Sequence, residues 1–230
     1  MTPVHGTIRR PYESICRSVV NRRIAFVFGT NYTSSGVLLG KNMLLTAAHN
    51  YASPRAPWAV VRDRNIQCGT GTVRSSAPWW TITDGFDRQS QVRTPPGFAY
   101  HDFGRDYALV GLGKKAPSES SFRLPRPDED SLLARGSVVF IAGFPAEGRN
   151  SGSILFHGRA RIRTIDAFGF EYELETERGL SGSPVWIERN GEFIIVGIHV
   201  RNGGAVRLTN VALKYLEEWQ NEFQSVRPEL

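Results

Sequence analysis

The sequence predicts an all-β protein that ends in one α-helix. Short apolar or alternating segments recur along its 230 residues, separated by Gly, Pro, Asn and Ser. Many short strands at near-regular spacing are typical of a β-sandwich or barrel. All-β folds of roughly 200–250 residues often form one unit, and a chain of this length can bury most of its apolar surface without disulfide staples.

The expected strands are rich in Val, Ile, Leu and Phe and lie between turn-forming residues. They are Ile24–Phe28, Gly36–Leu39, Met43–Thr46, Trp58–Val61, Tyr107–Leu112, Ser137–Ala142, Ile154–Arg163, Phe170–Leu174, Pro184–Ile187, Phe193–Val200 and Ala205–Leu208. Two segments have the Asn-Gly chemistry of hairpin turns, at residues 189–191 and 202–204.

The C-terminal helix is expected to begin at Thr209 or Asn210, either of which can cap its first turn. Apolar side chains then recur every four residues and should pack on the body of the protein. That stripe consists of Val211, Tyr215, Trp219 and Phe223. Upstream, the polar and proline-containing residues 114–136 are the expected linker between two halves.

The chain is basic, with a formal net charge of +6 and a pI near 9.6. A basic excess can indicate a nucleic-acid partner. Here the basic residues are scattered or paired, as at Arg9-Arg10 and Arg22-Arg23, which favours solvated surface charge. We therefore expect no nucleic-acid partner, and that function stays an alternative motivated by charge alone.

Nothing in the sequence indicates a metal, a cofactor or a membrane span, and we expect a monomer. The two cysteines, Cys16 and Cys68, allow one disulfide, and no metal-ligand spacing appears. No apolar run approaches the roughly 18 residues that a membrane helix needs. The beginning, MTPVHGTIRRPYESIC, has no apolar core, so we expect no signal peptide in this chain.

Three short segments carry chemistry, in the order His, Asp, Ser. Residues 44–49, LLTAAH, form an apolar strand that ends in small residues and His49. Residues 106–110, DYALV, place Asp106 directly before an apolar strand. Residues 179–184, GLSGSP, set Ser181 among glycines ahead of a β segment.

The residue types suit nucleophilic catalysis. A serine hydroxyl is a weak nucleophile at neutral pH and needs an adjacent base, a role that histidine fills because its pKa lies near neutrality. A carboxylate on the far ring nitrogen fixes the tautomer and stabilises the imidazolium. Glycines allow a tight turn that directs backbone N–H groups at a developing oxyanion, here those of Gly179 and Ser181.

Each segment alone has a plainer interpretation. A histidine after a strand is commonly structural, and an aspartate before a strand or a serine among glycines is commonly a turn residue. Asp102, Asp84 and Asp87 also compete with Asp106, which we favour because the apolar strand begins directly after it. The three segments together, in this order in a β-rich chain, predict a catalytic triad.

These segments resemble the chymotrypsin-like serine peptidases, and in particular the bacterial glutamyl endopeptidase branch, which staphylococcal V8 protease typifies. The matching stretches extend from about residue 20 to residue 220. They are Gly36–Lys41, Leu44–Thr46 with His49, Asp106–Val110, Ala142–Pro145, Gly179–Val185, Val196–His199 and Gly204–Val206, followed by the terminal helix.

The resemblance implies two six-stranded antiparallel β-barrels with the active site in the cleft between them. His49 and Asp106 would come from the first barrel, residues 21–120, and Ser181 from the second, residues 121–230, which includes the helix. Residues 1–20 would be an N-terminal extension. The resemblance also implies protein or peptide substrates, an acyl-enzyme intermediate, no cofactor, and export from the cell.

The residue before the serine departs from the digestive members of the superfamily. Those enzymes carry an aspartate that pairs with a new N-terminus after zymogen cleavage, whereas this chain has Leu180, which forms no ion pair. The resemblance therefore gives no support to that form of activation here. N-terminal control of another kind stays open, because the glutamyl branch can use its mature N-terminal amine near the substrate.

Primary specificity rests on three residues. In the glutamyl branch a threonine or serine five positions before the nucleophile and a histidine on a later strand bind the acidic side chain, and Thr176 and His199 occupy those places. Both can donate to a carboxylate, which would favour protonated His199. Glu175 opposes this reading, since trypsin-like members select basic residues from that position, but strand alternation would turn it away from Thr176.

The sequence therefore predicts a serine endopeptidase that prefers an acidic residue before the scissile bond. The same protease with basic or other specificity, because of Glu175, is one alternative. A non-catalytic protein-binding module on the same fold is another, because a fold does not fix function.

Overall fold

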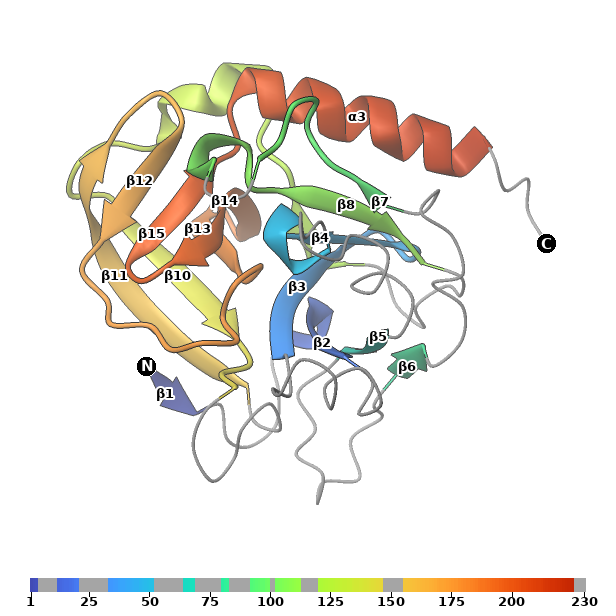
Figure 1. Ribbon diagram of the computed structural model, residues 1–230. Coiled ribbons are helices and arrows are strands. Elements are labelled where there is room, and N and C mark those ends of the chain that lie inside the picture. The colour runs from blue at the N-terminus through green and yellow to red at the C-terminus, as the bar shows by residue number, and fades with distance from the viewer. Residues whose placement is uncertain are drawn as a thin grey trace.

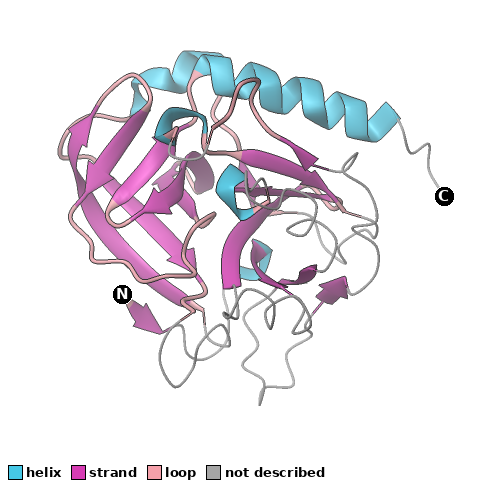
Figure 2. Cartoon of the chain, in the orientation of Figure 1, coloured by secondary structure: helices cyan, strands magenta, loops and turns pink. Residues whose placement is uncertain are grey.

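The structure, a computed structural model, describes residues 1–3, 12–20, 33–51, 64–68, 80–82, 92–99, 102–112, 120–146 and 155–225. Most of these residues form β-strands or their connections (Figure 2). The described residues contain one α-helix, α3 (Asn210–Ser225), at the C-terminal end. The predicted all-β class with a C-terminal helix is confirmed.

The second half of the chain closes into a six-stranded antiparallel barrel. Its strands follow the order β11, β10, β13, β14, β15, β12, and β12 pairs back with β11. Their bounds are β10 (Val138–Gly143), β11 (Phe156–Ile165), β12 (Gly169–Tyr172), β13 (Pro184–Arg189), β14 (Glu192–Arg201) and β15 (Gly204–Arg207). Two short strands join its outside: β1 (Thr2–Pro3) on β11 and β9 (Phe122–Arg123) on β14.

The first half forms a separate seven-stranded sheet beside this barrel (Figure 1). Within the described ranges its strands run as an open path in the order β6, β5, β2, β3, β4, β8, β7. Their bounds are β2 (Ile15–Val20), β3 (Thr33–Leu39), β4 (Met43–Thr46), β5 (Arg64–Cys68), β6 (Trp80–Ile82), β7 (Val92–Arg93) and β8 (Ala108–Gly111). A closed barrel beside a second sheet agrees with the expected two-barrel fold.

The expected strands agree with those of the structure to within a few residues, and Met43–Thr46 agrees at both ends. The predicted strands Ile24–Phe28 and Trp58–Val61 lie outside the described residues. The short strands β1 and β9 and four strands of the first sheet, β2, β5, β6 and β7, were not predicted. Ile15–Val20 falls in the expected N-terminal extension, yet as β2 it pairs with both β3 and β5.

Cys16 is disulfide-bonded. It is buried in β2, and Cys68, the chain's other cysteine, is its Cα partner across the pairing with β5. A bond between the two would join neighbouring strands of the first sheet, a placement that the sequence left open.

The largest apolar cluster joins the two β units and the helix. Side chains from the first sheet, from the second barrel and from α3 meet in it, so the interface between the halves is itself a hydrophobic core. Its members include Ile15, Val37, Leu45 and Leu109 from the first half, Phe144, Trp186 and Ile198 from the second, and Leu216 and Trp219 from α3. Two smaller clusters fill the interiors of the individual units.

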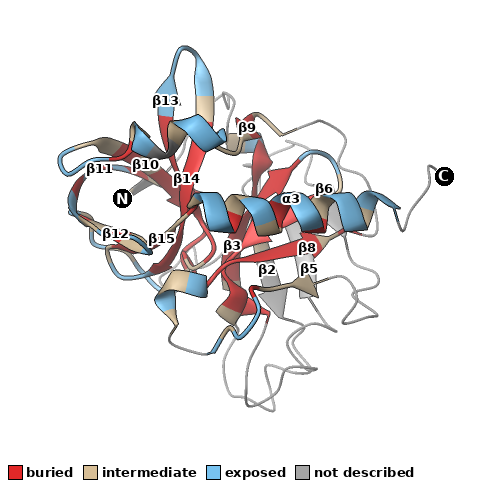
Figure 3. Ribbon diagram, turned by 90° about the horizontal axis from the view of Figure 1, so that it is seen from above, coloured by how far each residue is buried: buried red, intermediate tan, exposed pale blue. Residues whose placement is uncertain are grey.

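The helix α3 begins in the second half but extends along the first sheet (Figure 3). The Trp219 ring lies 6.0 Å from that of Tyr107, and Glu222 accepts a hydrogen bond of 2.9 Å from Arg93 Nε in β7. The predicted stripe is wrong at Val211, which is 67% exposed, while Leu216 is buried. Four-residue spacing drifts around a helix of 3.6 residues per turn, so the buried face alternates steps of three and four.

Both predicted hairpin turns are present. Arg189 and Glu192 are paired across β13 and β14, which leaves Asn190 and Gly191 as a two-residue loop. Both loop residues have positive φ, 52° and 79°, the conformation that favours Asn-Gly in a tight hairpin. The second turn joins β14 to β15 through Asn202 and Gly203.

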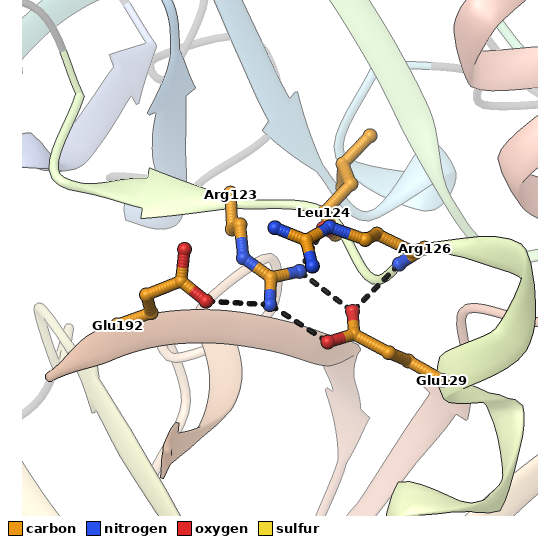
Figure 4. A network of polar contacts seen from close by, with 5 residues as sticks. All are labelled: Arg123, Leu124, Arg126, Glu129 and Glu192. Atoms are coloured by element: carbon orange, nitrogen blue, oxygen red, sulfur yellow. Dashed lines mark hydrogen bonds and ion pairs between the residues drawn. The ribbon is translucent and has the colours of Figure 1, made fainter. Parts of the chain in front are cut away.

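A network of ion pairs ties the predicted linker to the second barrel (Figure 4). Arg123 in β9 donates to both carboxylate oxygens of Glu129, at 2.7 and 2.8 Å, and to Glu192 on β14 at 2.8 Å. Glu129 lies in the 3-10 helix η5 (Pro127–Leu132) and also accepts the backbone N–H of Arg126. These contacts, the Arg123 side chain first, lower the pKa of Glu129 to about 2.

We predict that Arg123→Ala lowers the free energy of unfolding by about 1–3 kcal/mol, because hydrogen bonds to charged groups contribute on that order. Arg123→Lys should recover only part of the loss, since an ammonium cannot match the planar fork that binds two carboxylates. Denaturant titration of the three proteins measures this. Equal stability of wild type and Arg123→Ala would show that the network contributes nothing.

The same variant has a predicted pH signature. Because the folded-state pKa of Glu129 is lowered, its stabilising effect is present above the unfolded pKa of roughly 4.3 and disappears as pH falls toward 2. The stability difference between wild type and Arg123→Ala should therefore shrink between about pH 5 and pH 2. A difference that stays constant over this range would contradict the assignment.

Candidate active site

His49 and Asp106 are joined by two hydrogen bonds. His49 Nδ1 lies 2.6 Å from Asp106 Oδ2, and the backbone N–H of His49 donates to Asp106 Oδ1 at 2.9 Å. Asp106 is buried, and the side chain of His49 is 13% exposed. The carboxylate thus fixes both the ring and the main chain of the histidine.

Strand register explains why these residues meet. β4 and β8 are antiparallel neighbours, with Thr46 at the end of one paired to Ala108 at the start of the other. His49 follows β4 in the 3-10 helix η2 (Ala48–Asn50), and Asp106 directly precedes Tyr107 and β8. Residues that lie just beyond such a pair emerge at the same edge of the sheet.

Of the competing aspartates, Asp102 does not take this position. Asp102 precedes the 3-10 helix η4 (Phe103–Arg105) and pairs with Arg105 at 3.7 Å. Asp84 and Asp87 lie outside the described residues. Among the described aspartates, Asp106 is the one hydrogen-bonded to His49.

Ser181 lies in a tight loop that leads into β13. Ser183 N–H donates to the carbonyl of Leu180 at 2.9 Å, and Gly182 N–H donates to the carbonyl of His199 in β14 at 2.8 Å. Gly182 has φ of +91°, a region that favours glycine. The loop is therefore folded back on itself and fastened to the neighbouring strand.

The carbonyl of Ser181 accepts two hydrogen bonds from the first half of the chain. Ser35 N–H in β3 donates to it at 2.9 Å, and Asn50 Nδ2 donates to it at 3.0 Å. Asn50 is the residue after His49, so Ser181 lies beside the turn that carries the histidine. The three predicted residues, far apart in the chain, thus come from segments that contact one another.

Two backbone N–H groups near the serine are oriented by their neighbours. The carbonyl of Arg178 accepts Ala146 N–H at 2.6 Å, and that of Leu180 accepts Ser183 N–H. Since the C=O and N–H of a trans peptide point in opposite directions, the N–H groups of Gly179 and Ser181 point away from these contacts. In the described part of the chain, neither of the two donates a hydrogen bond.

His199 is buried, and its ring is hydrogen-bonded. Its Nδ1 lies 2.5 Å from the Tyr172 hydroxyl, and the ring also shares a hydrogen bond with the backbone of Gly204. Burial, and secondarily the nearby His49, lower the pKa of His199 to about 3, so the ring is neutral at pH 7. Burial also raises the pKa of Tyr172, which keeps that phenol protonated.

Thr176 lies in the loop after β12 and is partly exposed. Its hydroxyl lies 3.1 Å from Asn202 Oδ1, and it accepts Gly203 N–H at 3.3 Å. These contacts attach the loop to the turn between β14 and β15. The loop that carries Thr176 is therefore joined to the strand that carries His199 through the turn at the end of β14.

Glu175 is exposed, but strand alternation does not govern its direction. The expected strand Phe170–Leu174 ends at Tyr172, and Leu174 N–H donates to the carbonyl of Tyr172 at 3.0 Å in a turn. Alternation of side chains holds only within a strand. The orientation of Glu175 is set by this loop.

A cavity of about 210 Å³ lies next to the segment that precedes Asp106. Its lining includes Phe103 of η4, Phe168 and Arg201. Phe103 is 40% and Phe168 70% exposed, and the Arg201 guanidinium lies 4.5 Å from the Phe103 ring centroid. Sequence reasoning missed these residues because no motif marks them and only the fold brings them together.

Neither a metal cluster nor a membrane-spanning helix occurs in the described ranges. No group of three His, Cys, Asp or Glu side chains there could hold a metal ion. No helix there is both long and apolar enough to cross a bilayer.

We predict that Gly182→Ala is strongly destabilising. A Cβ at this residue would lie 2.0 Å from the Ser35 carbonyl oxygen and 2.2 Å from Thr46 Oγ1. The left-handed backbone costs about 1–2 kcal/mol for alanine, and overpacking adds about 1–3 kcal/mol. Thermal or denaturant unfolding measures the loss.

Gly191→Ala is the matched control for this prediction. Gly191 also has positive φ, +79°, but a Cβ added to it would meet no atom within 4 Å. It should show the backbone cost without the packing cost. Similar losses for the two variants would mean that the contact between Gly182 and the first sheet is not tight.

The chain is similar to known peptidases over most of its length. The family model of the trypsin-like peptidase domain matches residues 34–198. Chymotrypsin-like elastase family member 1 of Macaca fascicularis is 27% identical over 114 residues, 49% of this chain and 40% of that protein. The same-named protein of Canis lupus familiaris is 24% identical over 136 residues, 59% of this chain and 49% of that protein. The matched stretches span less than half the length of these relatives.

Proposed function

Since this chain belongs to the family of trypsin-like peptidase domains, we propose that it is a serine endopeptidase with Ser181 as nucleophile, His49 as general base and Asp106 as the group that orients the histidine. The observation that carries this proposal is the pair of hydrogen bonds from His49 to Asp106. With Nδ1–H donated to the carboxylate, Nε2 is left as the proton acceptor.

In the first half of the reaction His49 Nε2 takes the proton of the Ser181 hydroxyl as Oγ attacks the substrate carbonyl carbon. The carbonyl oxygen becomes an oxyanion, which the N–H groups of Gly179 and Ser181 stabilise. The imidazolium is stabilised by Asp106 and returns its proton to the leaving amine. The C–N bond breaks, and an acyl-enzyme on Ser181 remains.

In the second half a water molecule replaces the amine. His49 takes a proton from the water, the hydroxide adds to the ester carbonyl, and the same N–H groups bind the second oxyanion. Collapse breaks the ester bond and returns the proton to Ser181 Oγ. Each step uses residues of this chain and water.

We predict that Ser181→Ala lowers kcat for peptide hydrolysis by about 10⁴-fold or more, because the nucleophile is removed. The fold should be intact, since the contacts of the Ser181 backbone do not involve its hydroxyl. The measurement is cleavage of an internally quenched peptide, with circular dichroism as the folding control. Undiminished cleavage by a folded Ser181→Ala protein would remove the assignment.

A non-catalytic binding module on the same fold is the second candidate function. A fluorophosphonate probe separates the two, because it forms a covalent bond only with an activated serine. We expect labelling of wild type at Ser181 and none of Ser181→Ala. A wild-type protein that is folded but unlabelled would favour the module.

We further propose that the preferred residue before the scissile bond is acidic. The Thr176 hydroxyl and the neutral His199 ring are hydrogen-bond donors, and a substrate carboxylate would compete with Asn202 and Gly204 for them. The sequence predicted that a protonated His199 would bind the carboxylate through its positive charge. The neutral ring would instead bind the carboxylate through an N–H donor alone. Glu175 on the exposed loop is the group that would favour basic substrates instead.

A peptide library tests this preference. We predict that kcat/KM for Glu at the position before the scissile bond exceeds that for Lys by at least about tenfold, equivalent to ~1.4 kcal/mol. Thr176→Val should reduce the Glu preference, and Glu175→Gln should leave it in place. Preferential cleavage after Lys or Arg that Glu175→Gln abolishes would reverse the assignment.

A further inference from the structure

The residue after His49 contacts the loop of Ser181 with its side chain. Asn50 is fully buried at the end of η2. Its Nδ2 donates to the Ser181 carbonyl at 3.0 Å and to Thr46 Oγ1 at 3.1 Å, so both N–H bonds of the amide are used. One side chain thus reaches from the histidine turn to the backbone of the proposed nucleophile.

These contacts belong to a closed ring of hydrogen bonds. Thr46 Oγ1 donates to the carbonyl of Ser35 at 2.7 Å, and Ser35 N–H returns to the Ser181 carbonyl at 2.9 Å. Asn50 completes the ring between Thr46 and Ser181. Within it the Thr46 hydroxyl accepts from Asn50 and donates to Ser35, and hydrogen bonds in such a buried chain strengthen one another in the low local dielectric.

We propose that Asn50 is a positioning residue that sets the distance between His49 and the Ser181 hydroxyl; this inference rests on the proposed function. His49 and Asn50 are consecutive in a single turn. Asp106 fixes the first of them, and the amide of the second fixes Ser181. Both reacting groups are therefore held relative to the same short piece of backbone.

The distance between His49 and the Ser181 hydroxyl affects the rate of the proposed reaction. A misplacement of about 1 Å between reacting groups can reduce a rate by about 10²-fold. Without Asn50 the Ser181 carbonyl would keep only the Ser35 N–H as a first-sheet donor. The loop also packs closely on this amide, because a Cβ added at Gly182 would lie 2.9 Å from Asn50 Nδ2.

The test compares Asn50→Ala with a matched core variant. Val139→Ala removes a buried side chain from the second barrel, in a cluster that contains neither Ser181 nor His49. Both variants should be less stable than wild type. We expect Asn50→Ala to lower kcat about 10- to 100-fold with KM nearly unchanged, and Val139→Ala to retain the wild-type kcat.

If Asn50→Ala does not fold, a second variant, Thr46→Val, tests the inference. Thr46→Val keeps the shape of the side chain and removes the hydroxyl that holds the amide of Asn50. It should lower kcat in the same direction by a smaller factor. Rates are expressed per folded molecule, from the near-ultraviolet circular dichroism of each protein below its unfolding transition.

Three results bear on the inference, and they distinguish its failure from failure of the proposed function. Wild-type kcat in folded Asn50→Ala and Thr46→Val would overturn the positioning role and leave the peptidase assignment intact. A folded wild-type protein that neither cleaves peptides nor reacts with a fluorophosphonate would overturn both. A rise in KM with unchanged kcat would assign Asn50 to substrate binding and would also contradict the inference.

Discussion

The contact between the Ser181 carbonyl and its two donors from the first half of the chain is the constraint on which the site depends. Ser35 N–H and Asn50 Nδ2 bind one oxygen atom across the interface between the halves. Ser35 Oγ adds two more hydrogen bonds there, to the carbonyl of Gly179 and from the N–H of Phe144, both at 2.9 Å, and apolar side chains pack around them. Apolar contacts tolerate small shifts, whereas a buried polar group must keep its partners. The hydrophobic core therefore holds the two halves together, and these polar contacts fix how the halves are aligned.

The pairing of His49 with Asp106 and the placement of Ser181 depend on different contacts. Strand register within the first sheet brings His49 to Asp106, and this needs no contribution from the second half. Ser181, in contrast, depends on docking of the two halves, to which α3 contributes by crossing from the second half to the first. For the proposed function, a change that loosens this docking would move Ser181 away from His49.

Sequence reasoning succeeded where the signal is local. Met43–Thr46 and the Asn190-Gly191 turn follow from apolar runs and turn chemistry. It failed where long-range contacts determine the secondary structure. In Ile15–Val20 the apolar residues are interrupted by Cys-Arg-Ser, so no strand was predicted. The segment is a strand because it pairs with β3 on one side and β5 on the other. The neutral state of His199 and the ring through Asn50 were equally invisible, since burial and contacts between distant segments create them.

The most direct test of this account is a crystal structure of the protein after reaction with a small phosphonate, in which the tetrahedral phosphorus mimics the intermediate. The account predicts phosphorus bonded to Ser181 Oγ, a phosphonyl oxygen bound by the N–H groups of Gly179 and Ser181, and His49 Nε2 within hydrogen-bonding distance of the adduct. An adduct on another residue, or an imidazole out of reach of Ser181 while the Ser35 and Asn50 contacts are intact, would contradict it.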